Sequence, residues 1–111
     1  METNALPKCP VEITLALVSN KWRILIIRDL LMGKKRFNEL KKSVNGVSSK
    51  VLTSNLREME VSQLLTRTVY AEIPPRVEYC LTETGLSLKP VIDAMLIWGK
   101  EYKEKMNKKK T

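Results

Sequence analysis

Hydrophobic and polar positions follow a helical period along the first forty residues. Proline is tolerated in the first turn of a helix, so Pro10 predicts a helix start, and the apolar spacing extends that helix to about Val18. From Lys21 the pattern is apolar nearly all round, which favours a helix at the centre of the core, ended by Gly33. A shorter amphipathic helix is predicted over about residues 36–43.

A strong turn signal, Asn45-Gly46, separates this short helix from a longer one predicted from Val47 to Glu60. So few residues lie between the two helices that they must cross steeply, as the helices of a helix-turn-helix unit do. One face of the longer helix is apolar enough to dock on a core, at Leu52, Leu56 and Met59.

The opposite face of that longer helix carries short hydroxyl side chains and cations: Ser49, Lys50, Thr53, Ser54 and Arg57. Small donors between cations allow a helix to approach a polyanion closely and to reach base edges in a major groove. These five residues are therefore the candidates for base contact, and Ser48 at the start of the helix joins them as a DNA-binding residue. The alternative is an ordinary solvent-exposed face.

Two short runs, residues 65–70 and 77–82, alternate polar with apolar side chains, are rich in β-branched and aromatic residues, and predict a two-stranded hairpin. Pro74-Pro75 removes two backbone donors and fixes φ, so the tip should be a stiff projecting loop with Arg76 at its shoulder. A stiff basic loop beside a helix-turn-helix is typical of the wing of a winged helix. The alternative is a hairpin that only caps the core.

The stretch from Thr82 to Gly85 begins a final helical region, in which Pro90 marks a kink or the first turn of the main segment. This region has more apolar residues than one face of a helix can hold, which predicts burial on two sides. A domain of this size has too little remaining core to bury both sides. We therefore expect a homodimer built from this helix and the N-terminal helix. The expected fold is mainly α with a small β-hairpin (α+β), a single winged helix-turn-helix domain over residues 1–111 with frayed ends at 1–8 and 104–111.

The net charge of +8 and the pI near 9.7 favour an anionic partner, and the cations are concentrated in one part of the chain. Residues 34–57 hold seven cations against one acid, whereas residues 58–99 hold three cations against six acids. Phosphate contacts are assigned to Lys34, Lys35, Lys42 and Arg76, and Arg36 joins them as a DNA-binding residue.

Several other classes of protein are disfavoured. The two cysteines show no pair spacing, which argues against a disulfide framework or a zinc site. No signal-peptide pattern or membrane span is present, so a cytoplasmic location and no membrane partner are expected. The chain has no histidine, paired-carboxylate motif or glycine-rich phosphate loop, so we expect no enzyme activity, no catalytic residue, no cofactor and no metal. A winged helix used as a protein-interaction module is the alternative function.

Six ordered motifs together resemble those of the HxlR-type winged-helix transcription regulators of bacteria. They are CPVE at residues 9–12, KW at 21–22, RFNEL at 36–40, SSKVLTSNLREME at 48–60, PPRVEYCLTETG at 74–85 and WG at 98–99. The resemblance spans nearly the whole chain. It implies a cytoplasmic homodimer that binds an inverted-repeat operator in double-stranded DNA.

The resemblance also singles out Cys9, because several members of that family sense electrophiles or oxidants through a cysteine near the N-terminus. A helix start and neighbouring Lys8 both stabilise a thiolate, which favours a redox sensor. The alternative is an inert cysteine packed in the dimer interface of a regulator without thiol sensing. Cys80 is expected in the core. Ser62-Gln63 stands where the family has an acidic residue and Gly, and a left-handed Gln costs about 1 kcal/mol relative to Gly, so this junction is expected to be rearranged.

Overall fold

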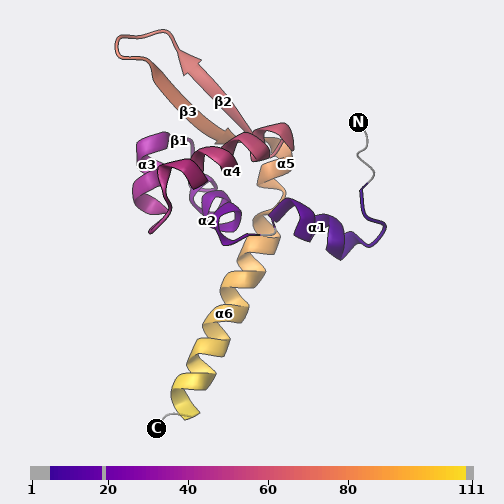
Figure 1. The fold of residues 1–111 in the computed structure, drawn as a ribbon. Coiled ribbons are helices and arrows are strands. Elements are labelled where there is room, and N and C mark those ends of the chain that lie inside the picture. The colour runs from indigo at the N-terminus through magenta and orange to yellow at the C-terminus, as the bar shows by residue number, and fades with distance from the viewer. Residues whose placement is uncertain (1–5, 19, 110–111) are drawn as a thin grey trace.

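A computed structural model of the protein describes residues 6–18 and 20–109, and it confirms a mainly helical winged helix-turn-helix fold with a small antiparallel sheet (Figure 1). The helices are α1 (Pro10–Val18), α2 (Lys21–Leu30), α3 (Phe37–Ser43), α4 (Ser49–Val61), α5 (Glu83–Leu86) and α6 (Lys89–Lys109). The strands are β1 (Lys35–Arg36), β2 (Leu65–Tyr70) and β3 (Arg76–Leu81). Within these described residues, no helix is both long and apolar enough to cross a membrane.

The core forms around α2, as its nearly all-apolar pattern predicted. Ile26 and Ile27 are fully buried, and the predicted apolar face of α4 is buried beside them, at Leu52, Leu56 and Met59. Asn20 begins α2 as its N-cap, because its side-chain oxygen accepts a hydrogen bond from the backbone N–H of Arg23. The turn between α3 and α4 contains Gly46 at φ 89°, a conformation that favours glycine.

The sheet has one strand more than the sequence predicted. β2 pairs antiparallel with β3 over its full length, from Leu65 opposite Leu81 to Tyr70 opposite Arg76, and this is the predicted hairpin. The two-residue strand β1 adds to the other edge of β3, with Lys35 opposite Tyr79. A pair of lysine and arginine residues has no strand periodicity, so only the pairing with β3 defines β1.

The exit from α4 passes through Gln63, whose φ of 64° is left-handed. Thr82, just before α5, closes this turn: its Oγ1 donates a hydrogen bond of 2.6 Å to the Gln63 carbonyl, and its backbone N–H donates to the Leu64 carbonyl at 3.0 Å. A Cβ added at Gly85 would lie 2.1 Å from that Leu64 carbonyl oxygen, so glycine is required there. The junction is therefore not rearranged; it keeps a left-handed residue, with Gln in place of Gly.

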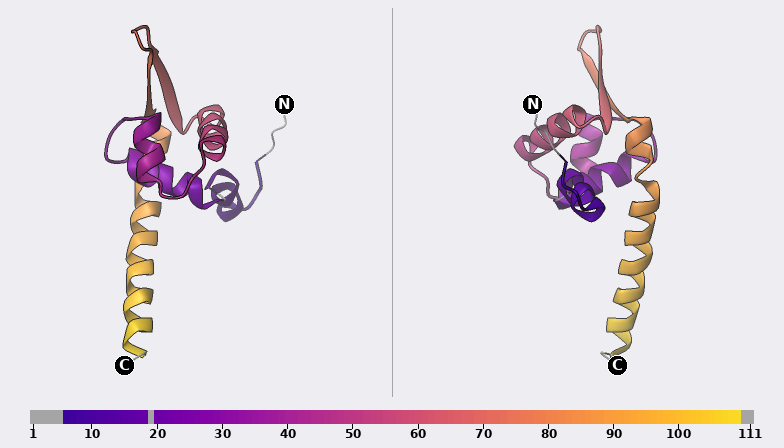
Figure 2. Two further views of the ribbon diagram at one scale, coloured as in Figure 1. Left: turned by 60° about the vertical axis from the view of Figure 1, so that its left-hand side comes forward. Right: turned by 90° about the vertical axis from the view of Figure 1, so that its right-hand side faces the viewer.

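The molecule is elongated because α1 and α6 extend away from the body. The radius of gyration is 16.2 Å, against about 13 Å for a compact domain of this length. Figure 2 shows that α6 and the hairpin project in opposite directions. Pro90 lies in the first turn of α6, which confirms one of the two predicted alternatives, a helix start rather than a kink. The prediction of a frayed segment from residue 104 is wrong as far as Lys109, because α6 continues to that residue; the predicted N-terminal fraying falls largely on residues 1–5, outside the described range.

Candidate nucleic-acid interface

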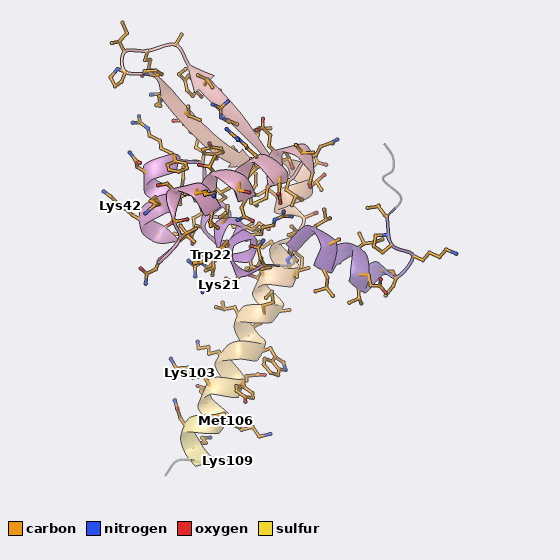
Figure 3. The ribbon with its side chains drawn as sticks, viewed as in Figure 1. Lys21, Trp22, Lys42, Lys103, Met106 and Lys109 are labelled. Atoms are coloured by element: carbon orange, nitrogen blue, oxygen red, sulfur yellow. The ribbon has the colours of Figure 1, made fainter. Side chains whose placement is uncertain are left out.

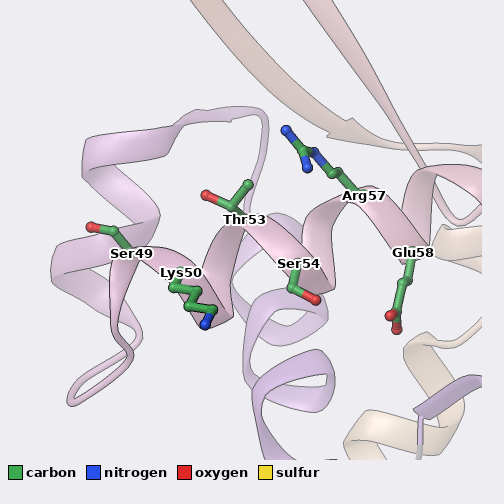
Figure 4. Close-up of a pocket in the computed structure, with 6 residues that line it drawn as sticks. All are labelled: Ser49, Lys50, Thr53, Ser54, Arg57 and Glu58. Carbon is green, nitrogen blue, oxygen red and sulfur yellow. The ribbon is translucent and has the colours of Figure 1, made fainter.

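Helix α4 presents one continuous polar face to solvent. Its N-cap is Ser48, whose Oγ accepts a hydrogen bond of 3.1 Å from the Val51 backbone N–H, so one orphan donor of the first turn is satisfied by the chain itself. Four of the five predicted base-contact residues are exposed and Thr53 is half-buried. Together with Glu58 they line a shallow surface groove: Ser49, Lys50, Thr53, Ser54 and Arg57 (Figure 4).

The groove has two chemically different sides. Figure 4 shows Arg57 extending on the side of the hairpin and Glu58 extending on the opposite side of α4. The hydroxyls and Lys50 come before both residues along α4, toward the start of the helix. A polyanion aligned with this face would meet donors over most of the length of α4 and would meet a carboxylate only at its far border.

The basic run that precedes α4 lies on β1 and α3. Lys34, Arg36 and Lys42 are exposed, and Lys35 is half-buried. The acid in this run, Glu39, accepts a hydrogen bond of 2.7 Å from the Arg36 backbone N–H at the start of α3. Its negative charge is thereby held at the positive end of the α3 dipole, so the run presents a mainly positive surface.

The shoulder of the wing is electrostatically balanced rather than simply basic. The Arg76 guanidinium lies 4.2 Å from the centre of the Tyr70 ring, with Glu72 at 3.2 Å and Glu78 at 3.5 Å. Lys34 also lies 3.5 Å from Glu78. A phosphate contact by Arg76 or Lys34 therefore has to compete with carboxylates of the wing itself.

Arg67 is a further cation of this surface and lies outside the predicted DNA-binding set. It is exposed on β2 and lines a second groove, together with Thr53, Arg57, Glu60 and the buried Tyr79. This groove adjoins the polar face of α4, so Arg67 extends the same positive surface toward the wing. The two-residue period of the strand could have found it, because Arg67 lies on the same face as the buried Leu65.

Both cysteines are exposed, although Cys80 was expected to be buried. Cys9 is exposed and its carbonyl accepts a hydrogen bond of 3.0 Å from Ile13 N–H, so it stands at the start of α1 as predicted. The prediction that Cys80 lies in the core is wrong: it is exposed, because Tyr79 and Leu81 on either side of it turn inward. Both thiols are free, and no cluster of three candidate metal ligands occurs among residues 6–18 and 20–109.

Comparison with known proteins shows which family this chain resembles. The model of the HxlR-like helix-turn-helix family matches residues 17–107. The uncharacterized HTH-type transcriptional regulator YdeP of Bacillus subtilis is 45% identical over 100 residues, covering 90% of this chain and 78% of that protein. An uncharacterized HTH-type transcriptional regulator of Methanothermobacter thermautotrophicus is 46% identical over 94 residues, covering 85% and 72% respectively.

A solved structure shares the arrangement of the elements. The redox regulator HypR in its reduced form superposes with a TM-score of 0.84 at 37% identity, covering 90% of this chain and 99% of that chain. The match extends over helices and hairpin together. The similarity therefore concerns the whole fold and not only the helix-turn-helix.

Proposed function

This chain belongs to the HxlR-like helix-turn-helix family of transcriptional regulators, and from that premise we propose that it binds an inverted-repeat operator in double-stranded DNA as a homodimer. The observation that carries the proposal is the outer face of α4, where hydroxyls and cations line one exposed groove behind a basic run. A helix of this composition fits the major groove.

In the proposed complex, α4 lies in the major groove and the residues of its outer face reach base edges. Lys34, Lys35, Arg36 and Lys42 contact phosphates and give affinity without sequence preference. Arg67 joins this group because it lines the groove between α4 and the wing. Arg76 holds the wing through Tyr70 and its carboxylates, and it reaches a phosphate only by exchanging one of them.

The proposed dimer is supported by apolar side chains that the single chain leaves uncovered. Val91, Met95, Trp98 and Tyr102 form one stripe of α6 and are 37% to 64% exposed, and Val11 and Leu15 of α1 are exposed as well. Exposed apolar stripes of this kind usually pack against the helices of a second copy of the chain. A dimer would place two α4 helices in successive major grooves, about 34–36 Å apart.

A DNA titration tests the function. The wild-type protein is titrated against a random duplex at two salt concentrations, and against duplexes that it selects from a randomised pool. Binding should weaken steeply with salt, and the selected sequences should form an inverted repeat. A protein-interaction module with this fold would show neither effect, and that outcome overturns the proposal.

The dimer is tested separately through Trp98→Glu, which places a charge in the α6 stripe. The variant should sediment as a monomer and lose most of its affinity for the selected inverted repeat, while it keeps weak binding to random duplex. Lys103→Glu on the same helix is the control. A variant at Trp98 that remains dimeric would place the interface elsewhere.

We further propose that Cys9 responds to oxidants or electrophiles, because it is exposed at the start of α1 and because HypR, a redox regulator, has the same fold. Diamide or a quinone should change operator affinity of the wild-type protein and of Cys80→Ser, and it should leave Cys9→Ser unchanged. Modification of Cys9 without a change in affinity would make it an inert thiol. Cys80 is exposed too, so its variant is an essential control.

A further inference from the structure

An arginine of the core helix is buried behind the polar face of α4. Arg23 of α2 is only 9% exposed, and all three nitrogens of its guanidinium have acceptors. Nε donates to Asn55 Oδ1 at 3.2 Å, Nη1 donates to the Leu17 carbonyl at 3.1 Å, and Nη2 pairs with Glu58 Oε1. One side chain therefore joins the last turn of α1 to two residues of α4.

Two asparagines complete this buried network. Asn55, which is 7% exposed, accepts a second hydrogen bond on Oδ1 from Asn20 Nδ2 at 3.0 Å. Its own Nδ2 donates to the Val51 carbonyl at 2.9 Å, so its amide is fixed in one orientation. Asn20 in turn accepts from the Arg23 backbone N–H at 3.0 Å. Arg23 and Asn55 depend on each other for hydrogen-bond partners because water has little access to either side chain.

The geometry makes the guanidinium difficult to replace. Its planar fork presents donors in fixed directions, whereas a lysine ammonium is a single flexible point charge. Apolar packing at Leu52 and Leu56 holds α4 against the core, but it is less directional than a hydrogen bond. Hydrogen bonds at Asn55 and Glu58, about one turn apart, constrain the rotation and sliding of α4. The pairing also holds the Glu58 carboxylate away from the side of Arg57, as Figure 4 shows.

We propose that Arg23 is a positioning residue that fixes α4 relative to α1 and so sets the half-site spacing that the dimer accepts in DNA. The inference rests on the proposed function, since it assumes an operator and a dimer that uses α1. Because the Leu17 carbonyl belongs to α1, a displacement of α1 in the dimer would be transmitted to α4 through one side chain. Figures 1 and 2 show α1 standing out from the body of the molecule.

A spacing assay tests this role with a readout that loss of stability alone would not change. The probes are the inverted-repeat duplex that the wild-type protein selects from a randomised pool, and copies with one or two base pairs added or removed between the half-sites. The wild-type protein should prefer the selected spacing. In Arg23→Gln, the ratio of affinities between selected and altered spacings should fall by about 2- to 30-fold, while the salt dependence on random duplex stays as in the control.

The control is Lys21→Gln, which removes one positive charge from the same helix. Lys21 is exposed, and its Nζ lies 4.5 Å from the centre of the Trp22 ring. Both residues are labelled in Figure 3. Glu58→Gln provides a second test that keeps Arg23 in place, because Glu58 is 60% exposed on its side chain and its loss should not unfold the domain. It should lower the spacing ratio in the same direction and by less.

The outcomes separate this inference from its premise. Folded, dimeric Arg23→Gln and Glu58→Gln variants that keep the wild-type spacing ratio overturn the positioning role and leave DNA binding intact. Should Arg23→Gln fail to fold, the ratio of Glu58→Gln alone decides. A wild-type protein that selects no duplex overturns the proposed function itself.

Discussion

Ser43, the last residue of α3, donates a hydrogen bond of 2.7 Å to Oδ2 of Asp29 in α2. The same carboxylate accepts from Arg28 at 2.7 Å on Oδ1 and at 3.2 Å on Oδ2, and Asp29 is only 6% exposed. This contact ties the first helix of the helix-turn-helix to the core helix. The polar face of α4 is therefore held from two directions, by Asp29 through α3 and by Arg23 from behind.

Replacing Asp29 by Asn should destabilise the domain by about 1–3 kcal/mol, because a buried acceptor with charged and hydroxyl donors is lost. The free energy of unfolding in urea measures this. Asp93→Asn is the matched control: its carboxylate pairs with Lys89 at the surface of α6, so its loss should stay within about 0.5 kcal/mol. Equal effects at both positions would contradict the role of Asp29.

The stability should also depend on pH through Asp29. Burial raises the pKa of this carboxyl, but hydrogen bonds from Arg28 and Ser43 outweigh burial, so its pKa lies below the ordinary value of 3.8. A lowered folded pKa means that the unfolded chain binds the proton more tightly. The ionised Asp29 carboxylate therefore contributes fully to the free energy of unfolding above pH 3.8, and this contribution is lost as the pH falls through the pKa of the folded state. Urea unfolding from pH 6 to pH 2.5 should show a shallower acid decline in Asp29→Asn than in the wild type.

The substitution Gln63→Gly should raise stability. A left-handed conformation costs a residue with a Cβ about 1–2 kcal/mol, and glycine removes this strain from the folded state. Glycine also has greater freedom in the unfolded chain, which offsets about 0.5–1 kcal/mol of that stabilisation. A net increase of about 0.5–1 kcal/mol is expected in thermal or urea unfolding. Gln63→Ala keeps the Cβ and should change little; if it stabilises as much as glycine, backbone strain is not the cause.

Adding one methyl group at Gly85 should be strongly unfavourable, because the new Cβ would meet the Leu64 carbonyl at 2.1 Å. The backbone at Leu64 also accepts from Thr82 N–H and cannot move without breaking that bond. Gly85→Ala should cost about 3 kcal/mol or more, at the upper end for overpacking. Thr84→Ala, at an exposed neighbouring position, should leave the melting temperature nearly unchanged.

Two substitutions on the proposed DNA-binding surface should have different effects on affinity and on sequence preference. Lys42→Ala should weaken binding to selected and random duplexes alike and reduce the slope of log affinity against log salt by about 0.9, the loss of one phosphate contact. Arg57→Ala should cost about 1–3 kcal/mol for the selected duplex and relax its sequence preference. An Arg57→Ala variant that binds the selected duplex with full affinity and preference would remove Arg57 from the base-reading set.

The elements whose signals are local could be predicted from the amino-acid sequence. The apolar stripe of α4, the turn at Gly46 and the hairpin could all be read from residue type and spacing, because helix period, strand alternation and turn chemistry act over a few neighbours. The polar outer face of α4 followed from the same period. Its exposure in the structure agrees with that prediction.

Contacts between residues far apart in the chain could not be predicted in this way, because they depend on how the elements pack. β1 exists because residues 35–36 lie beside β3, and Cys80 is exposed because Tyr79 and Leu81, on either side of it, are buried in the core. Lys34 finds Glu78 of β3 more than forty residues away, and Arg23 finds Asn55 and Glu58 more than thirty residues away. The residue type gives the charge of a side chain, but its interaction partners depend on how the folded helices and strands pack together.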